Sequence, residues 1–209
     1  MTNQPLLNFT EIFSLLFPKR INKSKILDFW CKKDEKATFL SKSSWSLALI
    51  CLLKKENKNS DISIWIPSFF CNESLLILRS TKTKIVFYPI SENLEPNYDL
   101  LNELKEKNGK PDIFLLVHFF GKPVKTIRTS DFCRSNNAWL IEDAVHCLSP
   151  SKEIGNKGDF ILYSPHKLLP IPNGSVLVAR TKGPSKISNE IIKKALDKYE
   201  RKRLLNSNN

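Results

Sequence analysis

Lys167 and Asp143 are the two residues of this sequence whose types and spacing could do chemistry together. A lysine amine condenses with an aldehyde to form an imine, and lysine suits this task because burial readily lowers its pKa. A carboxylate that faces a pyridine nitrogen keeps that nitrogen protonated, so that the ring can accept electrons. One such lysine downstream of one such carboxylate is the pair that pyridoxal phosphate (PLP) chemistry requires.

Two apolar segments should bring these side chains to one cleft. Residues 138–143 read as a short buried strand that carries Asp143 at its carboxyl end, where ligands bind in open α/β sheets. Residues 158–163 form a second apolar run that delivers Lys167 just past its end. Asp159 is the nearest competing carboxylate, but it opens its strand and should lie at the opposite edge. Taken alone, each side chain would be interpreted as a solvated or capping group. The interpretation as a shared site therefore depends on the two apolar strands that carry them.

The rest of the chain alternates between helices and apolar strands. Continuous apolar strands separated by helices imply a mostly parallel sheet buried on both faces. We therefore expect an α/β fold, a three-layer sandwich with a mostly parallel central sheet. Helices are expected near residues 10–17, 44–55, 72–80, 98–107 and 125–135, and strands near 62–66, 84–88, 112–118, Trp139, Ile161 and Val176.

A longer pattern surrounds the two side chains. From Ile141 to Ala179 the chain reads as a strand, Glu-Asp-x-x-His, a glycine-containing spacer, Gly-Asp-Phe, Ser-x-His-Lys, and a glycine before another strand. This order of motifs resembles the DegT/DnrJ/StrS family of PLP-dependent sugar aminotransferases, members of the fold-type-I aminotransferase superfamily. The resemblance implies the PLP-transferase large-domain fold. Four earlier stretches fit the same family in order: residues 39–49, 65–70, 85–90 and 117–123.

The resemblance implies a role for each of three catalytic residues. Lys167 would bind pyridoxal 5'-phosphate covalently, Asp143 would pair with the pyridinium nitrogen, and His146 would lie near the cofactor ring. All three would therefore also be cofactor-binding residues. No metal ion is implied, and no cluster in the sequence resembles a zinc site.

A phosphate site is implied as well. Ser164 would hydrogen-bond the cofactor phosphate, together with hydroxyl and backbone N–H groups at Ser43 and Ser44. Independently of the family, serines that open an apolar helix offer unsatisfied N–H groups and a positive dipole end to an anion. The alternative for this serine pair is an ordinary helix N-cap.

The sequence departs from the family pattern at two points near this site. The phosphate turn of the family usually contains glycine, whereas residues 41–44 read Ser-Lys-Ser-Ser. The family tends to place a ring-stacking aromatic residue after the Pro-Ser loop. Phe70 is our candidate for it, with Cys71 as the alternative by strict spacing, and Phe70 could equally belong to the core.

The length of 209 residues suits one large α/β core but not comfortably two domains. We expect an N-terminal helical extension over residues 1–38, a PLP-binding large domain over 39–180, and an amphipathic basic helix and tail over 181–209. Family members carry a second, smaller domain that supplies substrate and dimer contacts. By this comparison we expect the chain to lack the C-terminal small domain.

Composition narrows the classes of partner. The net charge of +12 comes mostly from scattered lysines without interleaved aromatics, which favours a solvated surface over a nucleic-acid site. The five cysteines are odd in number and lack CxxC spacing, so buried free thiols in a reducing cytoplasm are expected. No apolar run approaches membrane-spanning length, and the first residues lack a secretory pattern. We expect a cytoplasmic protein.

The leading hypothesis is a PLP-dependent aminotransferase, or its large-domain fragment, that acts on a sugar or nucleotide-sugar in surface polysaccharide biosynthesis. It would take an amino donor and, by the resemblance, form a homodimer. The alternative is a truncated, non-catalytic PLP-binding or interaction protein of the same fold. A basic nucleic-acid-associated α/β protein is the least favoured reading.

Overall fold

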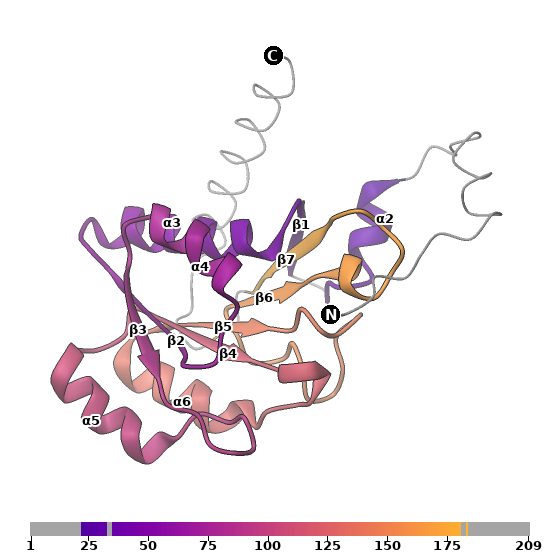
Figure 1. Cartoon of the computed structure of the whole chain (residues 1–209). Coiled ribbons are helices and arrows are strands. Elements are labelled where there is room, and N and C mark those ends of the chain that lie inside the picture. The colour runs from indigo at the N-terminus through magenta and orange to yellow at the C-terminus, as the bar shows by residue number, and fades with distance from the viewer. Residues whose placement is uncertain (1–21, 33–34, 181–182, 184–209) are drawn as a thin grey trace.

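A seven-stranded sheet forms the centre of the computed structural model, which describes residues 22–32, 35–180 and 183 (Figure 1). The strand order is β1-β7-β6-β5-β4-β2-β3. Strand β7 pairs antiparallel with both β6 and β1, and the other pairings are parallel, so β7 alone runs against the rest. The strands are β1 (Lys36–Leu40), β2 (Ser63–Pro67), β3 (Lys84–Tyr88), β4 (Ile113–Val117), β5 (Trp139–Asp143), β6 (Phe160–Tyr163) and β7 (Ser175–Ala179).

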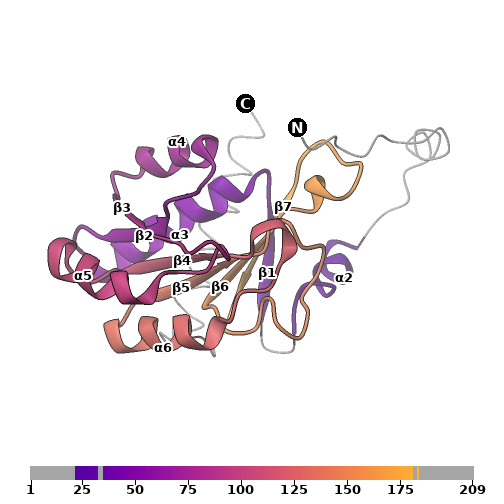
Figure 2. The same ribbon diagram turned by 60° about the horizontal axis from the view of Figure 1, so that its bottom comes forward.

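Helices cover both faces of the sheet and produce three layers. The helices α3 (Ser43–Lys58) and α4 (Asn72–Ser80) lie on one face, and α5 (Tyr98–Asn108) and α6 (Thr126–Asn136) lie on the other (Figure 2). The short helix α2 (Lys23–Leu27) lies beside the β1 end of the sheet. This is the α/β sandwich with a mostly parallel sheet that the sequence predicted.

Strand β2 shows why both faces must be covered. Its side chains are all buried, with Ile64 and Ile66 in the hydrophobic core under α3 and α4, and Trp65 in the core under α5 and α6. Successive side chains of a strand point to opposite faces, so an uninterrupted apolar strand needs a layer on each side.

Several elements differ from the expected ones. Strand β1 was not predicted, and it begins at Lys36, inside the segment expected to be a helical extension. Its sequence carries Lys36 and Thr38, and only Thr38 and Leu40 are buried, so it lacks the continuous apolar run of the central strands. The helix expected near residues 10–17 and the one expected after residue 181 lie outside the described residues. The three expected domain boundaries stay predictions.

The carboxyl ends of β1 and β6 meet at one edge of the sheet, because β7 pairs between them. Leu40 lies opposite Ser175, and Tyr163 lies opposite Val176. The loop from β6 to β7 is held at the same edge, because the backbone N–H of Gly174 donates to the carbonyl oxygen of Ser41 at 3.0 Å. The start of α3 is therefore brought beside the turn that follows β6.

Within the part of the chain that the structure describes, no helix has the length and apolar character needed to cross a membrane.

Candidate active site

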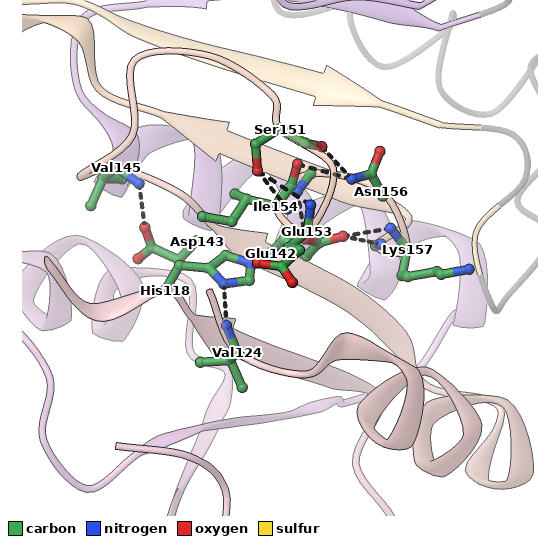
Figure 3. Close-up of polar contacts among 12 residues, drawn as sticks. His118, Val124, Glu142, Asp143, Val145, Ser151, Glu153, Ile154, Asn156 and Lys157 are labelled. Atoms are coloured by element: carbon green, nitrogen blue, oxygen red, sulfur yellow. Dashed lines mark hydrogen bonds and ion pairs between the residues drawn. The ribbon is translucent and has the colours of Figure 1, made fainter. Parts of the chain in front are cut away.

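Asp143 ends β5 as a buried carboxylate with one uncommitted oxygen. Its Oδ1 accepts a hydrogen bond from the backbone N–H of Val145 at 3.1 Å, a contact drawn in Figure 3. Among the described residues, none donates a hydrogen bond to Oδ2. Burial raises the pKa of the Asp143 carboxyl, and the Val145 N–H and the nearby Lys167 partly offset this rise. The side chain is thus oriented by the backbone and still able to accept an N–H from a ligand.

Lys167 follows the neighbouring strand and lies at the same edge of the sheet. It closes the 3-10 turn η2 (Pro165–Lys167) after β6, and its side chain is exposed. Strands β5 and β6 pair in parallel, with Asp143 opposite Leu162, so both residues lie at the carboxyl edge. The Lys167 amine acts on the pKa of Asp143, as expected for an amine and an acid that share one site.

His146 is held from two sides. Its Nδ1 accepts the backbone N–H of Phe120 at 3.3 Å, and its Nε2 lies 3.3 Å from Nζ of Lys167. The Phe120 ring stacks on the imidazole, with 5.9 Å between centroids and 7° between planes. Burial, and after it the positive charge of Lys167, lower the pKa of His146. The structure therefore brings the expected catalytic residues together, with His146 in its uncharged form beside the amine.

Ser164 is an orphaned polar group at this edge. The residue is fully buried, and its Oγ has no hydrogen-bond partner among the residues that the structure describes. Leaving a buried hydroxyl unpaired costs about 1–3 kcal/mol, and such groups are common where a ligand completes the site. The placement is consistent with the expected phosphate contact.

The serines that open α3 are placed as a phosphate site requires. Helix α3 begins at Ser43, which is half-buried, and Ser44 is buried in its first turn. Its N-cap residue is Lys42, in an extended conformation, and the Lys42 side chain makes no capping hydrogen bond within the described part of the chain. Neither serine is therefore the N-cap, and the first-turn N–H groups have no side-chain acceptor.

The candidates for a ring-stacking residue lie between β2 and α4. Phe70 is partly buried and packs against the core cluster under α3 and α4, whereas Cys71 is exposed and precedes the helix. Phe69 is 57% exposed and packs against Phe119, with ring centroids 5.6 Å apart. The assignment to Phe70 stays a prediction, and Phe69 is a further exposed aromatic in this loop that the sequence did not single out.

Glu142, the residue before Asp143, holds a role that the sequence did not reveal. Its carboxylate is fully buried and accepts four hydrogen bonds, from His118 Nε2 and from the backbone N–H groups of Gly155, Lys157 and Gly158 (Figure 3). Burial alone would raise the pKa of Glu142, but these hydrogen bonds, that of His118 first, lower it below its ordinary value. The signal for this role was the glycine-containing spacer, because a Cβ on Gly158 would lie 2.7 Å from the Phe160 oxygen and 3.1 Å from Glu142 Cγ.

His118 extends this network to the loop after β4. Its Nδ1 accepts the backbone N–H of Val124 at 3.1 Å, and its Nε2 donates to Glu142 Oε2 at 3.1 Å. The loop that carries Phe120 and the loop that carries His146 are thereby fixed to the same buried pair.

Asp159 lies at the other edge, as expected. It is fully buried just before β6, and its Oδ2 accepts the backbone N–H of Leu140 at 2.8 Å. This carboxylate secures the amino ends of β5 and β6. The expectation of buried cysteines holds for Cys51 and Cys133, whereas Cys71 is exposed, and all five thiols are free.

No family model matches the sequence. Solved structures do match the fold. Helicobacter pylori PseC, an aminotransferase involved in the biosynthesis of pseudoaminic acid, superposes with a TM-score of 0.69 at 16% identity, over 93% of this chain and 54% of that one. A putative sugar aminotransferase from Streptococcus pneumoniae, in its PLP form, gives 0.69 at 17% identity, over 94% and 56%. A DegT DnrJ EryC1 StrS aminotransferase from Brucella abortus gives 0.61 at 13% identity, over 83% and 47%.

The chain thus has the fold of PLP-dependent aminotransferases of fold type I, as the resemblance in its motifs implied. It spans about half the length of the structures that it matches. At these identities the comparison establishes the architecture, and the chemistry has to be argued from the residues at the carboxyl edge.

Proposed function

We propose that this chain is the cofactor-binding large domain, over residues 39–180, of a PLP-dependent aminotransferase that acts on a sugar or nucleotide-sugar. One observation carries the proposal. The amine of Lys167 and the buried carboxylate of Asp143 stand at the carboxyl ends of two paired parallel strands, in a fold shared with such enzymes.

The described residues fit pyridoxal 5'-phosphate. Asp143 offers a buried carboxylate oxygen without a donor, which suits a protonated ring nitrogen. Ser164 offers an unpaired buried hydroxyl, and the uncapped start of α3 at Ser43 and Ser44 offers N–H groups to a phosphate. Lys167 offers an exposed amine to an aldehyde. When bound, this cofactor supplies an aromatic ring that accepts the electrons of a carbanion next to the transferred nitrogen.

The other steps would depend on side chains of this chain. Lys167 Nζ would hold the cofactor covalently and, once an amino donor has displaced it, move a proton at the substrate carbon. Asp143 would keep positive charge on the ring nitrogen, and its burial excludes competing water. His146, uncharged beside the amine, would orient Lys167 Nζ. The phosphate contacts would retain the cofactor while no covalent bond to the protein exists.

The substrate and partners belong to the same proposal. One matching structure is named a putative sugar aminotransferase, and another an aminotransferase involved in the biosynthesis of pseudoaminic acid, which favours a sugar or nucleotide-sugar and an amino donor as the reactants. Net positive charge on the chain suits an anionic nucleotide-linked sugar. We further propose a homodimer that works in the cytoplasm in surface polysaccharide biosynthesis.

A second candidate is a non-catalytic PLP-binding protein of the same fold. The observation that favours it is the phosphate turn, where the residue preceding α3 is Lys42 and no glycine lets the backbone approach a ligand closely. Such a protein would bind the cofactor without passing an amino group on.

Absorbance spectroscopy tests the proposal. Purified protein mixed with PLP should develop a near-visible band that borohydride reduction fixes onto Lys167, as peptide mass mapping would show. Lys167→Ala should abolish the band, while Lys152→Ala, which removes another exposed lysine, should leave it unchanged. No band in the wild-type protein would end the proposal. A band that no amino donor discharges would favour the non-catalytic candidate.

A further inference from the structure

Phe120 adopts a backbone conformation that its own side chain does not explain. Its φ is 55°, in the left-handed region, and the following Gly121 has a φ of 76°. For a residue other than glycine this region costs about 1 kcal/mol or more. The Phe120 side chain is 75% exposed, so burial of its ring does not offset that cost.

The turn directs the backbone N–H of Phe120 at Nδ1 of His146, 3.3 Å away. An uncharged imidazole carries one hydrogen, on either Nδ1 or Nε2. Because Nδ1 accepts the Phe120 N–H, the hydrogen has to be on Nε2. Nε2 is the ring atom that lies 3.3 Å from Lys167 Nζ.

We propose that the left-handed turn at Phe120 is a positioning device that fixes the hydrogen of His146 on Nε2, the ring atom that faces Lys167 Nζ at 3.3 Å. Phe120 is thus a positioning residue that acts on Lys167 through His146. An ammonium group at Lys167 has no lone pair, and it could bind Nε2 only if the hydrogen moved to Nδ1, opposite the Phe120 N–H. The Nε2–H can be donated to the Lys167 nitrogen only when that nitrogen has a lone pair, which is also the form that condenses with an aldehyde. What the amine is used for rests on the proposed function, whereas the position of the hydrogen does not.

The two other histidines of the chain provide internal references. His118 accepts the Val124 N–H at Nδ1 and so carries its hydrogen on Nε2. His166 faces the carbonyl oxygen of Gly174 with Nδ1, at 2.8 Å, and so carries its hydrogen on Nδ1. In both cases the backbone partner determines the tautomer. We therefore expect an Nε2–H ring for His118 and His146 and an Nδ1–H ring for His166.

Nitrogen-15 NMR of the histidine-labelled, cofactor-free protein tests this pattern. Long-range proton–nitrogen correlations distinguish the two tautomers, and mildly alkaline solution keeps His146 uncharged because burial lowers its pKa. His146→Gln and His166→Gln assign the signals. We expect His146 to share the pattern of His118 and to differ from His166. An Nδ1–H pattern for His146 would overturn the proposal.

Two substitutions of Phe120 separate the turn from the ring. Phe120→Gly keeps the left-handed backbone and its N–H but removes the aromatic stack, so His146 should keep the Nε2–H pattern. Phe120→Val places a β-branched residue where positive φ is strongly disfavoured, so the turn should change and the pattern should be lost or become mixed. Loss of the pattern in Phe120→Gly, or its full retention in a folded Phe120→Val, would contradict the proposal. If Phe120→Val does not fold, the wild-type and Phe120→Gly spectra still decide.

The result is independent of whether the proposed function is correct. If His146 carries Nε2–H but PLP forms no band with Lys167, the positioning inference stands and the function fails. If the band forms while His146 carries Nδ1–H, the function stands and the inference fails.

Discussion

Glu142 and His118 form a fully buried pair, with 3.1 Å between Oε2 and Nε2, and this pair joins the loops on either side of the candidate active site. Breaking a buried pair by altering one partner is far more costly than its net contribution suggests, because the other polar groups lose their partners.

Glu142→Gln should therefore destabilise the protein markedly. The carboxamide offers one acceptor oxygen and two donors in place of a carboxylate that accepts four hydrogen bonds. We expect the free energy of unfolding in urea to fall by about 3 kcal/mol. Glu153→Gln, at an exposed position in the same loop, is the matched control and should change it by less than about 0.5 kcal/mol. A loss no larger than that of the control would show that the four hydrogen bonds to Glu142 contribute little to stability.

The same carboxylate predicts a loss of stability in acid. Because the folded-state pKa of Glu142 is below the ordinary value of 4.5, its contribution is present above that value and is lost as pH falls through the folded pKa. The stability difference between wild type and Glu142→Gln should therefore shrink as pH falls below 4.5. Urea titrations of both proteins over a pH series measure it, and a difference that stays constant into acid would contradict the assignment.

Asp143→Asn should act with the opposite sign. The pKa of Asp143 is raised by burial, so holding its charge in the folded state costs stability at pH values above the folded pKa. An amide keeps an oxygen for the Val145 N–H and removes the buried charge, and we expect a gain of about 0.5–2 kcal/mol at neutral pH. Thermal unfolding measures it, with PLP binding followed in parallel. The variant should bind PLP more weakly while being more stable, and a less stable variant would refute the prediction.

Ser164→Ala should affect the cofactor and not the fold. Its hydroxyl is buried without a partner among the described residues, so removing it leaves the stability of the cofactor-free protein unchanged or slightly higher. PLP affinity should fall by about tenfold, which corresponds to about 1.4 kcal/mol. Ser46→Ala is the control, since Ser46 is also buried but its Oγ lies 3.4 Å from Ser175 Oγ. Equal PLP affinity in wild type and Ser164→Ala would remove Ser164 from the phosphate site.

The central elements were predictable because their signals are local. Helix α4 and strand β3 have the bounds that the sequence predicted, and both carry clear apolar patterns between turn residues. Asp143 and Lys167 lie at one edge, as the sequence predicted, because Asp143 ends one buried strand and Lys167 follows the next. Long-range pairing decides what was missed. Strand β1 is fixed by β7, far along the chain, and its own sequence is only weakly apolar.

The contacts of His146 also could not be predicted from the sequence. Phenylalanine does not favour a positive φ, so the residue type at position 120 does not predict one. The positive φ of Phe120 accompanies the turn before Gly121 and the contact with His146. The hydrogen bonds to Glu142 likewise require the glycine-containing spacer to fold back over β5, and the apolar periodicity of the sequence does not predict this fold-back.

The two acids that end β5 occupy consecutive positions, and a pleated strand turns consecutive side chains to opposite sides. Glu142 is held in the protein interior by its hydrogen-bond donors, whereas Asp143 keeps one carboxylate oxygen for a ligand. The register of β5 therefore matters: a shift by a single residue that brought Asp143 to the position of Glu142 would leave its shorter side chain short of the donors to Glu142, and would put Ala144 at the position that Asp143 now holds. Insertions or deletions in this strand should therefore be tolerated far less well than in the loops around it.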